Sequence, residues 1–399
     1  MHLQTSPIRA IHFLAVAFAV FWAPAPSALA AGVNELTQEE LAEGWIKLFD
    51  GQTLFGWKAA NEADWKVEEG AIVVTTGDQG LLHTTTQFAD YTLKVDFRSA
   101  PGTNSGIFLH TPPVPGDPAS DCYELNIAPP DNPFPTGSFV GRQKVEGNHE
   151  SDQWQSYEVT LRGGECQVNL DGETVLEYTD PDPLRRGYIG LQLNSGKVQF
   201  RNIKLKPLAT ESIFNDSDVT GWKIDQARES EFTAEDGVLR VRNGPGQIES
   251  EGEYADFILQ LDVLVNGEHL NSGIFFRSIP GDFQNGYESQ IHNGFRDGDP
   301  TQPIDAGTGA IFRRQSARRV VPRDFEWFHK TIVADGPHMA VWVNGYQVTD
   351  WTDTRQPDEN PRRGQRLKAG TLIIQGHDPT TDLSFRNMRI AELPERQEP

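Results

Sequence analysis

The chain has 399 residues and a formal net charge of −22 at pH 7, from 57 acidic and 35 basic side chains. A negative field of this size repels DNA, RNA and anionic membrane surfaces, so the composition argues against nucleic-acid binding and favours neutral ligands. Glycine (37) and proline (26) are both plentiful, which is typical of many short strands joined by turns.

Residues 1–30 have the pattern of a secretory signal peptide. Arg9 precedes the apolar run AIHFLAVAFAVFWAP, and the small residues Ala28 and Ala30 stand where a signal peptidase cleaves. The run is too short for a comfortable membrane span, and two prolines interrupt it. The sequence therefore predicts a periplasmic or secreted protein without a membrane span.

The rest of the chain is a duplication, because nine short segments recur in the same order with slowly drifting spacing. The clearest pairs are FADYTLKVDF and YADFILQLDV (88–97, 254–263), NSGIFLH and NSGIFFR (104–110, 271–277), YELNI and YESQI (123–127, 287–291), and VQFRNIKL and LSFRNMRI (198–205, 383–390). We therefore predict two domains, residues 31–208 and 209–395, which we call copy one and copy two.

Both copies have the alternation of strands. TLKVDF, QSYEVTL and ECQVNL alternate apolar and polar residues with a period of two. NLDGETV and WVNGYQV contain Asp-Gly and Asn-Gly, which tight hairpin turns require. A helical pattern is nearly absent after TQEELAEGW at 37–45. The sequence thus predicts an all-β chain of two tandem sandwiches, each made of two antiparallel sheets with one face free to form a groove.

The ordered motifs FDG…GW, NSGIF, GYE-x-Q-I, TGAI and FRNI resemble those of the 3-keto-disaccharide hydrolase domain family. The resemblance covers nearly all of the chain after residue 31. It implies a concanavalin A-like jelly roll in each copy and the cleavage of glycosides whose sugar carries a ketone at carbon 3. It implies a carbohydrate substrate and no cofactor.

Copy two keeps more of the family pattern than copy one. Arg277 follows NSGIFF, and Glu288, Gln290 and His292 lie in or just after YESQI. Copy one has His110, Asn126 and Ala128 in place of the arginine, the glutamine and the histidine, and it retains Glu124. We therefore expect copy two to be the catalytic one.

The spacing of the polar residues in YESQIH predicts that they line a groove. In a strand, Glu288, Gln290 and His292 project to one face, and three polar side chains in a row do not form a core. Arg277 ends the neighbouring strand if NSGIFF and YESQI pair. We predict as catalytic residues Glu288, His292 and Arg277, and as substrate-binding residues Gln290, Tyr287, Asn271, Glu124 and His110.

The chemistry that the resemblance implies needs a base, an oxyanion stabiliser and a proton donor. The ketone acidifies the proton on carbon 2, so its removal lets the substituent on carbon 1 leave, and water then adds back. Glu288 or His292 is the base, the other is the acid, and Arg277 and Gln290 stabilise the enolate. The two-carboxylate mechanism of ordinary glycosidases remains an alternative, with Asp297, Asp299 and Asp305 following in a loop that could fold over the groove.

Each of these features also has a purely structural interpretation. Glu288 and Arg277 would form a buried ion pair, His292 would be a surface side chain, and Asn-Ser-Gly would serve a turn and close packing. The arginines at 313, 314, 318, 319 and 323 are either a solvated loop or a groove edge that attracts an anionic glycan.

Other site classes have little or no support in the sequence. Cys122 and Cys166 lie without a nearby histidine pattern, DGDP at 297–300 is a weak calcium signal, and motifs for nucleotide sites, metalloproteases and serine hydrolases are missing. We predict no metal. The alternatives to an enzyme are a lectin-like carbohydrate-binding module and a tandem adhesion module.

Overall fold

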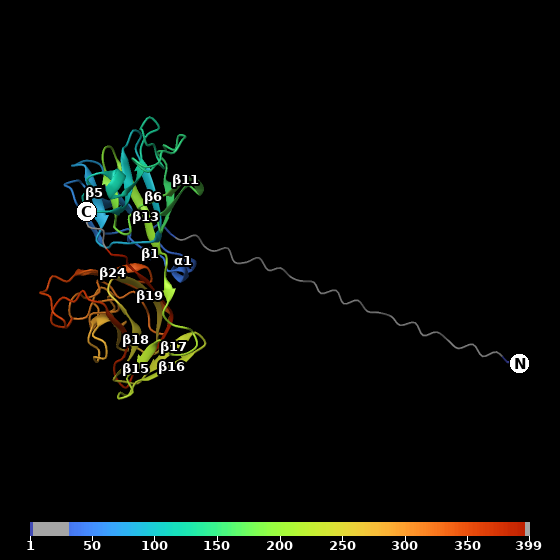
Figure 1. Ribbon diagram of the computed structural model, residues 1–399, viewed down its shortest axis with the longest axis vertical. Coiled ribbons are helices and arrows are strands. Elements are labelled where there is room, and N and C mark those ends of the chain that lie inside the picture. Colours follow the sequence, from blue (N-terminus) through green and yellow to red (C-terminus); the bar gives the residue numbers. More distant parts are fainter. Residues whose placement is uncertain (3–31, 396–399) are drawn as a thin grey trace. The chain divides into compact units, whose positions relative to one another are not determined.

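The computed structural model describes residues 1–2 and 32–395 (Figure 1). The predicted signal segment, residues 1–30, falls almost wholly outside this part of the chain. None of the helices in the described residues is long and apolar enough to cross a membrane. Residues 32–395, which contain both copies, lie in one compact unit.

Copy one contains an eight-stranded and a five-stranded sheet. The first has the order β11-β10-β9-β6-β13-β4-β3, with β1 also paired to β13, and the second has the order β2-β5-β12-β7-β8. The strands are β1 (Ile46–Lys47), β2 (Trp57–Ala59), β3 (Lys66–Glu68), β4 (Ala71–Val74), β5 (Gly80–Thr84), β6 (Tyr91–Ser99), β7 (Ser105–Thr111), β8 (Tyr123–Ile127), β9 (Gln155–Arg162), β10 (Glu165–Leu170), β11 (Glu173–Thr179), β12 (Tyr188–Leu193) and β13 (Val198–Pro207).

Copy two repeats this topology strand for strand. Its eight-stranded sheet has the order β16-β17-β26-β19-β22-β23-β24, with β14 paired to β26, and its five-stranded sheet has the order β15-β18-β25-β20-β21. The strands are β14 (Glu211–Ser212), β15 (Trp222–Ile224), β16 (Glu231–Glu235), β17 (Val238–Arg242), β18 (Gly246–Tyr254), β19 (Phe257–Val265), β20 (Ser272–Ser278), β21 (Tyr287–Ile291), β22 (Phe328–Asp335), β23 (His338–Val343), β24 (Tyr346–Thr352), β25 (Gly370–Gly376) and β26 (Asp382–Glu392).

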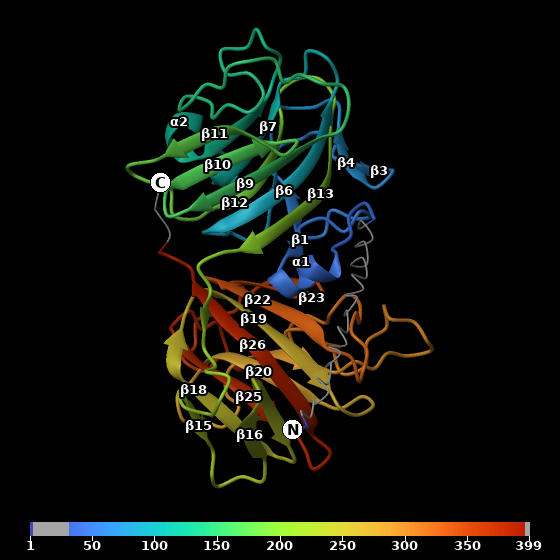
Figure 2. The same ribbon diagram turned by 90° about the vertical axis from the view of Figure 1, so that its right-hand side faces the viewer.

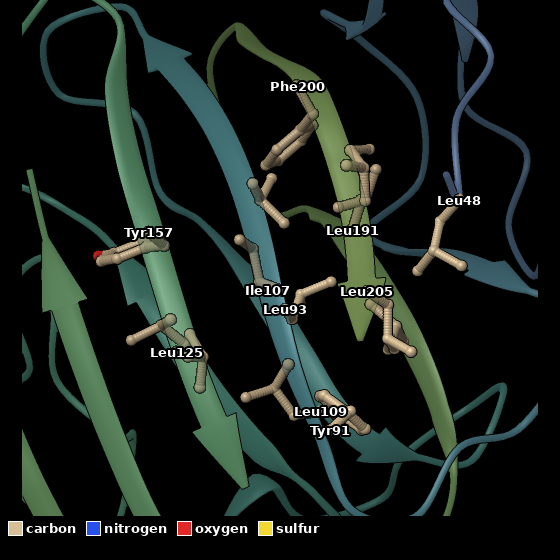
Figure 3. Packing of buried hydrophobic residues seen from close by; sticks show 14 of the residues in the cluster. Leu48, Tyr91, Leu93, Ile107, Leu109, Leu125, Tyr157, Leu191, Phe200 and Leu205 are labelled. Atoms are coloured by element: carbon tan, nitrogen blue, oxygen red, sulfur yellow. The ribbon is translucent and has the colours of Figure 1, made fainter. Parts of the chain in front are cut away.

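The two sheets of each copy enclose one apolar core, so the prediction of two tandem all-β sandwiches is confirmed. In copy one, Leu93 and Tyr157 of the larger sheet share a buried cluster with Ile107 and Leu125 of the smaller sheet (Figure 3). A second cluster occupies the same place in copy two. In Figure 2, β9, β6 and β13 of copy one lie side by side, as do β22, β19 and β26 of copy two.

The repeated FRN motif forms the same β-bulge in both copies. Asn202 and Asn387 take positive φ angles of 50° and 52°, and the pairing register shifts at these points. The Asn202 amide donates to Asp96 at 2.6 Å, and the Asn387 amide donates to Asp262 at 2.7 Å. Asparagine suits this position because it tolerates a left-handed backbone and its side chain can bond locally. The motif is therefore a structural signature of the fold.

Local signals in the sequence are also confirmed. α1 (Gln38–Glu43) begins with a capping box between Thr37 and Glu40. The predicted Asn-Gly hairpin joins β23 to β24, with φ of 47° at Asn344 and 71° at Gly345, as a type I′ turn requires. The short α2 (Pro118–Asp121) was not predicted. Cys122 and Cys166 are both buried and free, so they form no disulfide.

Candidate functional site

The outer face of the smaller sheet of copy two carries the polar residues. Tyr287 and Ile291 of β21 belong to the core, so the alternating Glu288 and Gln290 face outward. β21 is the edge strand, and it pairs only with β20 within its sheet. Glu288 and Gln290 therefore share a face, as the sequence predicts, whereas His292 lies beyond the end of β21.

The strand register places these side chains in two rows. In the first row, Glu288 lies opposite Phe275, which lies opposite Ile373. In the second row, Gln290 lies opposite Gly273. Gln375 of β25 lies opposite Gln247 of β18 and continues the second row. Because glycine has no side chain, the second row contains a gap flanked by amides.

The carboxyl group of Glu288 fills this gap. A Cβ atom added to Gly273 would lie 2.7 Å from the Glu288 Oε1 atom and 2.9 Å from its Cγ atom. Glycine at this position therefore lets Glu288 lie across the sheet. The Gly of the NSGIF motif has a direct connection to the candidate site, beyond its role in packing.

The environment of Glu288 suits proton transfer near neutral pH. Its side chain is only 9% exposed, and burial raises its pKa to about 7. The Arg362 guanidinium, His377 and Lys330 act in the opposite direction, favouring the carboxylate. Within residues 32–395, the structure records no hydrogen bond or ion pair between the Glu288 carboxyl group and another residue. A desolvated carboxyl group with a pKa near 7 can act as a base or as an acid.

Two amides beside Glu288 offer free acceptors. The Gln290 Nε2 atom donates to the Asp305 Oδ2 atom at 2.9 Å, and the Gln375 Nε2 atom donates to the Gln284 Oε1 atom at 2.9 Å. The Oε1 atoms of Gln290 and Gln375 are buried and have no partner in the described residues. A buried acceptor without a partner is costly. Sugar hydroxyl groups are donors that would satisfy both oxygens.

Asn271 and Asp305 orient Gln290. The Asn271 amide donates to the Asp305 Oδ2 atom at 2.5 Å, so both amides converge on one carboxylate oxygen. Asn271 was predicted to bind substrate, but the structure places it behind Gln290 as a positioning residue. Asp299, another acid of this loop, accepts from its own loop at Thr301 (2.9 Å). No group of three or more His, Cys, Asp or Glu within the described residues is placed to hold a metal ion.

Lys330 lies on the core side of the site strand, and the sequence analysis missed it. It is 1% exposed on β22, and its Nζ atom donates to the carbonyl oxygens of Ser289 (3.0 Å) and Gln290 (2.9 Å). Burial lowers the pKa of Lys330 to about 7, and the charge of Glu288 opposes this. In FHKTIVAD the lysine occupies an inward position of the alternation, which was the available signal.

The structure does not bring Arg277 to Glu288, so its predicted catalytic role is corrected. Arg277 is fully buried, with a positive φ of 48°. Its guanidinium donates to the Ala255 carbonyl at 2.7 Å, the Gly336 carbonyl at 2.7 Å and the Asp256 carboxylate at 2.9 Å. These bonds occupy the guanidinium, so it stabilises the fold rather than an enolate.

His110, the counterpart of Arg277, is likewise bonded to backbone carbonyls. Its ring nitrogens lie 2.7 Å from the Ala89 carbonyl oxygen and 2.8 Å from the Leu184 carbonyl oxygen. Ala89 and Ala255 are matched positions of the two copies. The ring is buried, and both of its nitrogens are occupied, so the predicted binding role of His110 is also replaced by a structural one.

Tyr287 and His292 differ from their predicted roles as well. The Tyr287 ring lies in the core, and its hydroxyl donates to the Asp353 Oδ2 atom at 2.7 Å. His292 is four residues from Glu288, and extended chain covers about 13 Å in that distance. Its Nδ1 atom accepts from the Gly294 amide at 3.2 Å, which leaves the Nε2 atom as the donor. No hydrogen bond or ring contact between Glu288 and His292 is recorded in residues 32–395, and the charge of Asp305 acts on both of them.

Two other carboxylates near this face are engaged by neighbouring groups: Asp305, whose charge raises the pKa of Glu288, accepts from Gln290 and Asn271, and Glu249 lies on a more distant strand. Glu249 faces the same side as Glu288, and Ile373 and Phe275 of the two intervening strands separate them. Three strand spacings of about 4.8 Å put the two Cα atoms about 14 Å apart. Glu249 also accepts from Thr371 at 2.6 Å, which fixes its orientation.

Copy one has a poorer version of the same face. Burial raises the pKa of Glu124 to about 7, as it does for Glu288, but the Gln192 amide donates to Glu124 at 3.2 Å. Leu81 stands at the position of Gln247, and Cys122 stands at the position of Gly286. Copy one therefore keeps the acid, the Gln192 amide and a shorter amide at Asn126, but Leu81 replaces the third amide.

A small recess adjoins Glu288. It has a volume of about 80 Å³ and is lined by Gly286, Tyr287, Glu288, Ile311, Phe312, Arg313, Arg314, Pro361 and Arg362. Three of these residues carry guanidinium groups, and Arg362 also lies over the Phe275 ring at 5.5 Å. Arg362 comes from a loop that none of the repeated segments covers, so the sequence analysis did not name it.

Comparisons with known proteins point to carbohydrate chemistry. A family model described as a 3-keto-α-glucoside-1,2-lyase-like domain matches residues 44–206 and 209–391. A 3-keto-disaccharide hydrolase from Bacteroides thetaiotaomicron is 24% identical over 245 residues, covering 45% of this chain and 83% of the relative.

Two solved structures are similar to parts of this chain. One, from Parabacteroides distasonis, has a provisional assignment as a glycosyl hydrolase. It is 25% identical with a TM-score of 0.40, covering 44% of this chain and all of that one. The other is a carbohydrate-binding module from Bacillus subtilis. It is 13% identical with a TM-score of 0.30, covering 37% of this chain and 94% of that one.

Proposed function

The chain belongs to the 3-keto-α-glucoside-1,2-lyase-like domain family, with one family domain in each copy, and on that premise we propose that it cleaves glycosides whose sugar carries a ketone at carbon 3. The groove of copy two is the reaction site. The observation that carries this proposal is the Glu288 carboxyl group, which lies over Gly273 with a pKa raised to about 7.

Glu288 removes the proton from carbon 2 of the 3-keto sugar. The electron pair of that bond moves into the carbon 2–carbon 3 bond, and the ketone oxygen becomes an enolate. When the enolate collapses, the bond from carbon 1 to the glycosidic oxygen breaks and the leaving alcohol takes a proton. Water then adds at carbon 1, and a proton returns to carbon 2, so the net reaction is hydrolysis.

Other groups of copy two supply the remaining roles. Arg362 replaces Arg277 as the enolate stabiliser, because it lines the recess beside Glu288 and its charge favours the Glu288 carboxylate. The free oxygens of Gln290 and Gln375 accept from sugar hydroxyls. Glu288, once protonated, can return its proton to the leaving oxygen, so a second acid within a few ångströms is not required. His292, just beyond the Ile291 end of β21, binds another part of the substrate.

Copy one serves as a carbohydrate-binding accessory in this proposal. Glu124 is bonded to Gln192, and the apolar Leu81 takes the place of a groove amide. We also propose that residues 1–30 direct export, that the protein acts in the periplasm or outside the cell, and that the copies comprise residues 31–208 and 209–395. The support for export is the signal-like sequence alone.

The test is to incubate the purified protein with a 3-keto disaccharide and to measure the free sugar released. The Glu288→Gln variant should lose turnover by at least 100-fold, since a general base contributes about 10²–10⁴-fold. The matched Glu124→Gln variant should retain it. Binding without release by the wild-type protein would favour the lectin-like alternative, and equal losses in both variants would refute the choice of copy two.

A further inference from the structure

The basic run between residues 313 and 323 divides into two groups with different tasks. Arg318 pairs with Asp50 at 2.9 Å and lies over the rings of Phe55 and Tyr346 at 4.1 and 4.3 Å, so it serves packing. Arg313 and Arg314 instead line the recess beside Glu288. Cations therefore gather at this recess although the protein has a net charge of −22.

No ion pair is recorded for either of these two cations within residues 32–395. In the described residues, the Arg314 guanidinium donates only to backbone carbonyls, those of Arg362 at 2.7 Å and Arg313 at 3.3 Å. The recorded contact of the Arg313 guanidinium is the Phe312 ring at 5.3 Å. Burial and the nearby charges of Arg355 and Arg313 lower the pKa of Arg314, although Asp353 partly opposes them. Such a cluster is the arrangement that attracts an oxyanion.

In copy one, the arginine at the position of Arg314 forms an ion pair with a carboxylate. The pairs Phe139–Gln143 and Ile311–Gln315 form matching bridges, which aligns Arg142 with Arg314. Arg142 binds Asp180 at 2.7 Å, and Asp180 also accepts from the Tyr123 hydroxyl.

In copy two, the equivalent aspartate is already occupied. Asp353 accepts from the Tyr287 hydroxyl, as Asp180 does from Tyr123. Arg355 binds it with two bonds of 2.9 and 2.8 Å. Arg314 is therefore left without the carboxylate that Arg142 has. Arg313 adds a further charge where copy one has Gly141, and both residues have positive φ angles, of 60° and 71°.

We propose that Arg313 and Arg314 bind an oxyanion carried by the sugar, a carboxylate or a sulfate ester, so that the substrate class of copy two is acidic. This proposal rests on the proposed function for its link to turnover, but the binding site itself does not. The recess is far smaller than a pocket for a whole ligand, which is about 300–1,000 Å³. It accepts one substituent while the ring lies along the groove.

The test measures binding without any 3-keto substrate. Glucuronate, glucose 6-sulfate and glucose are titrated by calorimetry or ligand-observed NMR at low salt and at 150 mM salt. Wild-type protein should bind at least one acidic sugar at least fivefold more tightly than glucose, with a smaller difference at the higher salt because screening weakens exposed ion pairs. The two acidic sugars distinguish a carboxylate site from a sulfate site.

Variants at the recess identify the residues responsible. Arg314→Gln combined with Arg313→Gly, which restores the residue of copy one, should abolish the preference and leave glucose binding unchanged. Arg240→Gln, at an exposed residue of β17, is the matched control and should keep the preference. Equal binding of all three sugars by the wild-type protein, no binding of any of them, or a preference that survives the double variant would overturn the proposal.

The outcome for the anion site is separable from that for the enzyme. If acidic sugars bind through these arginines but no 3-keto glycoside is cleaved, the proposed function fails and the anion site stands. If neutral 3-keto disaccharides are cleaved but acidic sugars gain nothing from the arginines, the proposed function stands and the anion site fails.

Discussion

Replacing Glu288 with glutamine should stabilise the protein at alkaline pH while removing activity. Burial raises the pKa of Glu288 from its ordinary 4.5 to about 7. Folding therefore favours the protonated form, and the stability that this confers is fully present below pH 4.5 and is lost as pH rises through 7. At about 1.4 kcal/mol for each pH unit, the ionised carboxylate costs the folded state about 3 kcal/mol at pH 8.

The assay is urea unfolding of both proteins at several pH values between 4 and 8. The free energies of unfolding of wild type and Glu288→Gln should agree within about 0.5 kcal/mol near pH 4, and the variant should be more stable by about 3 kcal/mol at pH 8. Part of this gain is offset because Lys330 loses the charge that favours its own protonation. Glu251→Gln, at an exposed position, should show no such trend.

A different result would refute the reasoning about the site. If Glu288→Gln destabilises the protein by 3–5 kcal/mol at every pH, Glu288 is one partner of a buried ion pair, and its removal leaves an unpaired charge. If the difference is constant and small, the carboxyl group is ordinarily solvated. Neither outcome is compatible with a desolvated base that is free of partners.

Three further variants test the surroundings of Glu288. Lys330→Tyr, which introduces the residue type of copy one, should keep the bond to the Gln290 carbonyl but remove a charge that lowers the Glu288 pKa. Because activity rises as Glu288 loses its proton, this rise in the pH–rate profile should move to higher pH. An unchanged profile would contradict this. Gly273→Ala should displace the Glu288 carboxyl group and lower kcat at least tenfold. The free energy of unfolding should change by about 1 kcal/mol or less, because the added methyl group meets a movable side chain. Full activity would show that Glu288 does not need the gap at Gly273. His292→Ala should raise KM several-fold and leave kcat nearly unchanged, whereas a loss of kcat alone would return His292 to a catalytic role.

Much of the fold could be predicted because its signals are local and occur twice. The alternation in YESQI and in TLKVDF identified strands and faces, and Asn344-Gly345 identified a hairpin. Matched segments in register then implied matched topologies, which β6 and β19 illustrate as the central strands of equivalent sheets.

The candidate site was harder to predict because its partners come from distant segments. Arg277 lies within β20, but it has a positive φ where the pairing register shifts, and its guanidinium bonds to backbone carbonyls. Arg362 reaches Glu288 from a loop with no counterpart among the repeats. Lys330 belongs to the opposite sheet and donates a hydrogen bond to the Gln290 carbonyl across the core. Alternation alone shows none of these relationships.

The most direct test is to follow carbon 2 of the substrate in deuterated water. If Glu288 removes that proton and water adds back after elimination, the released 3-keto sugar should carry deuterium at carbon 2. Brief incubation of the product without enzyme controls for spontaneous exchange, and Glu288→Gln should release no labelled sugar. A hydrolysed product that retains its original hydrogen at carbon 2 would contradict the account, because the glycosidic bond would then have been cleaved without proton abstraction.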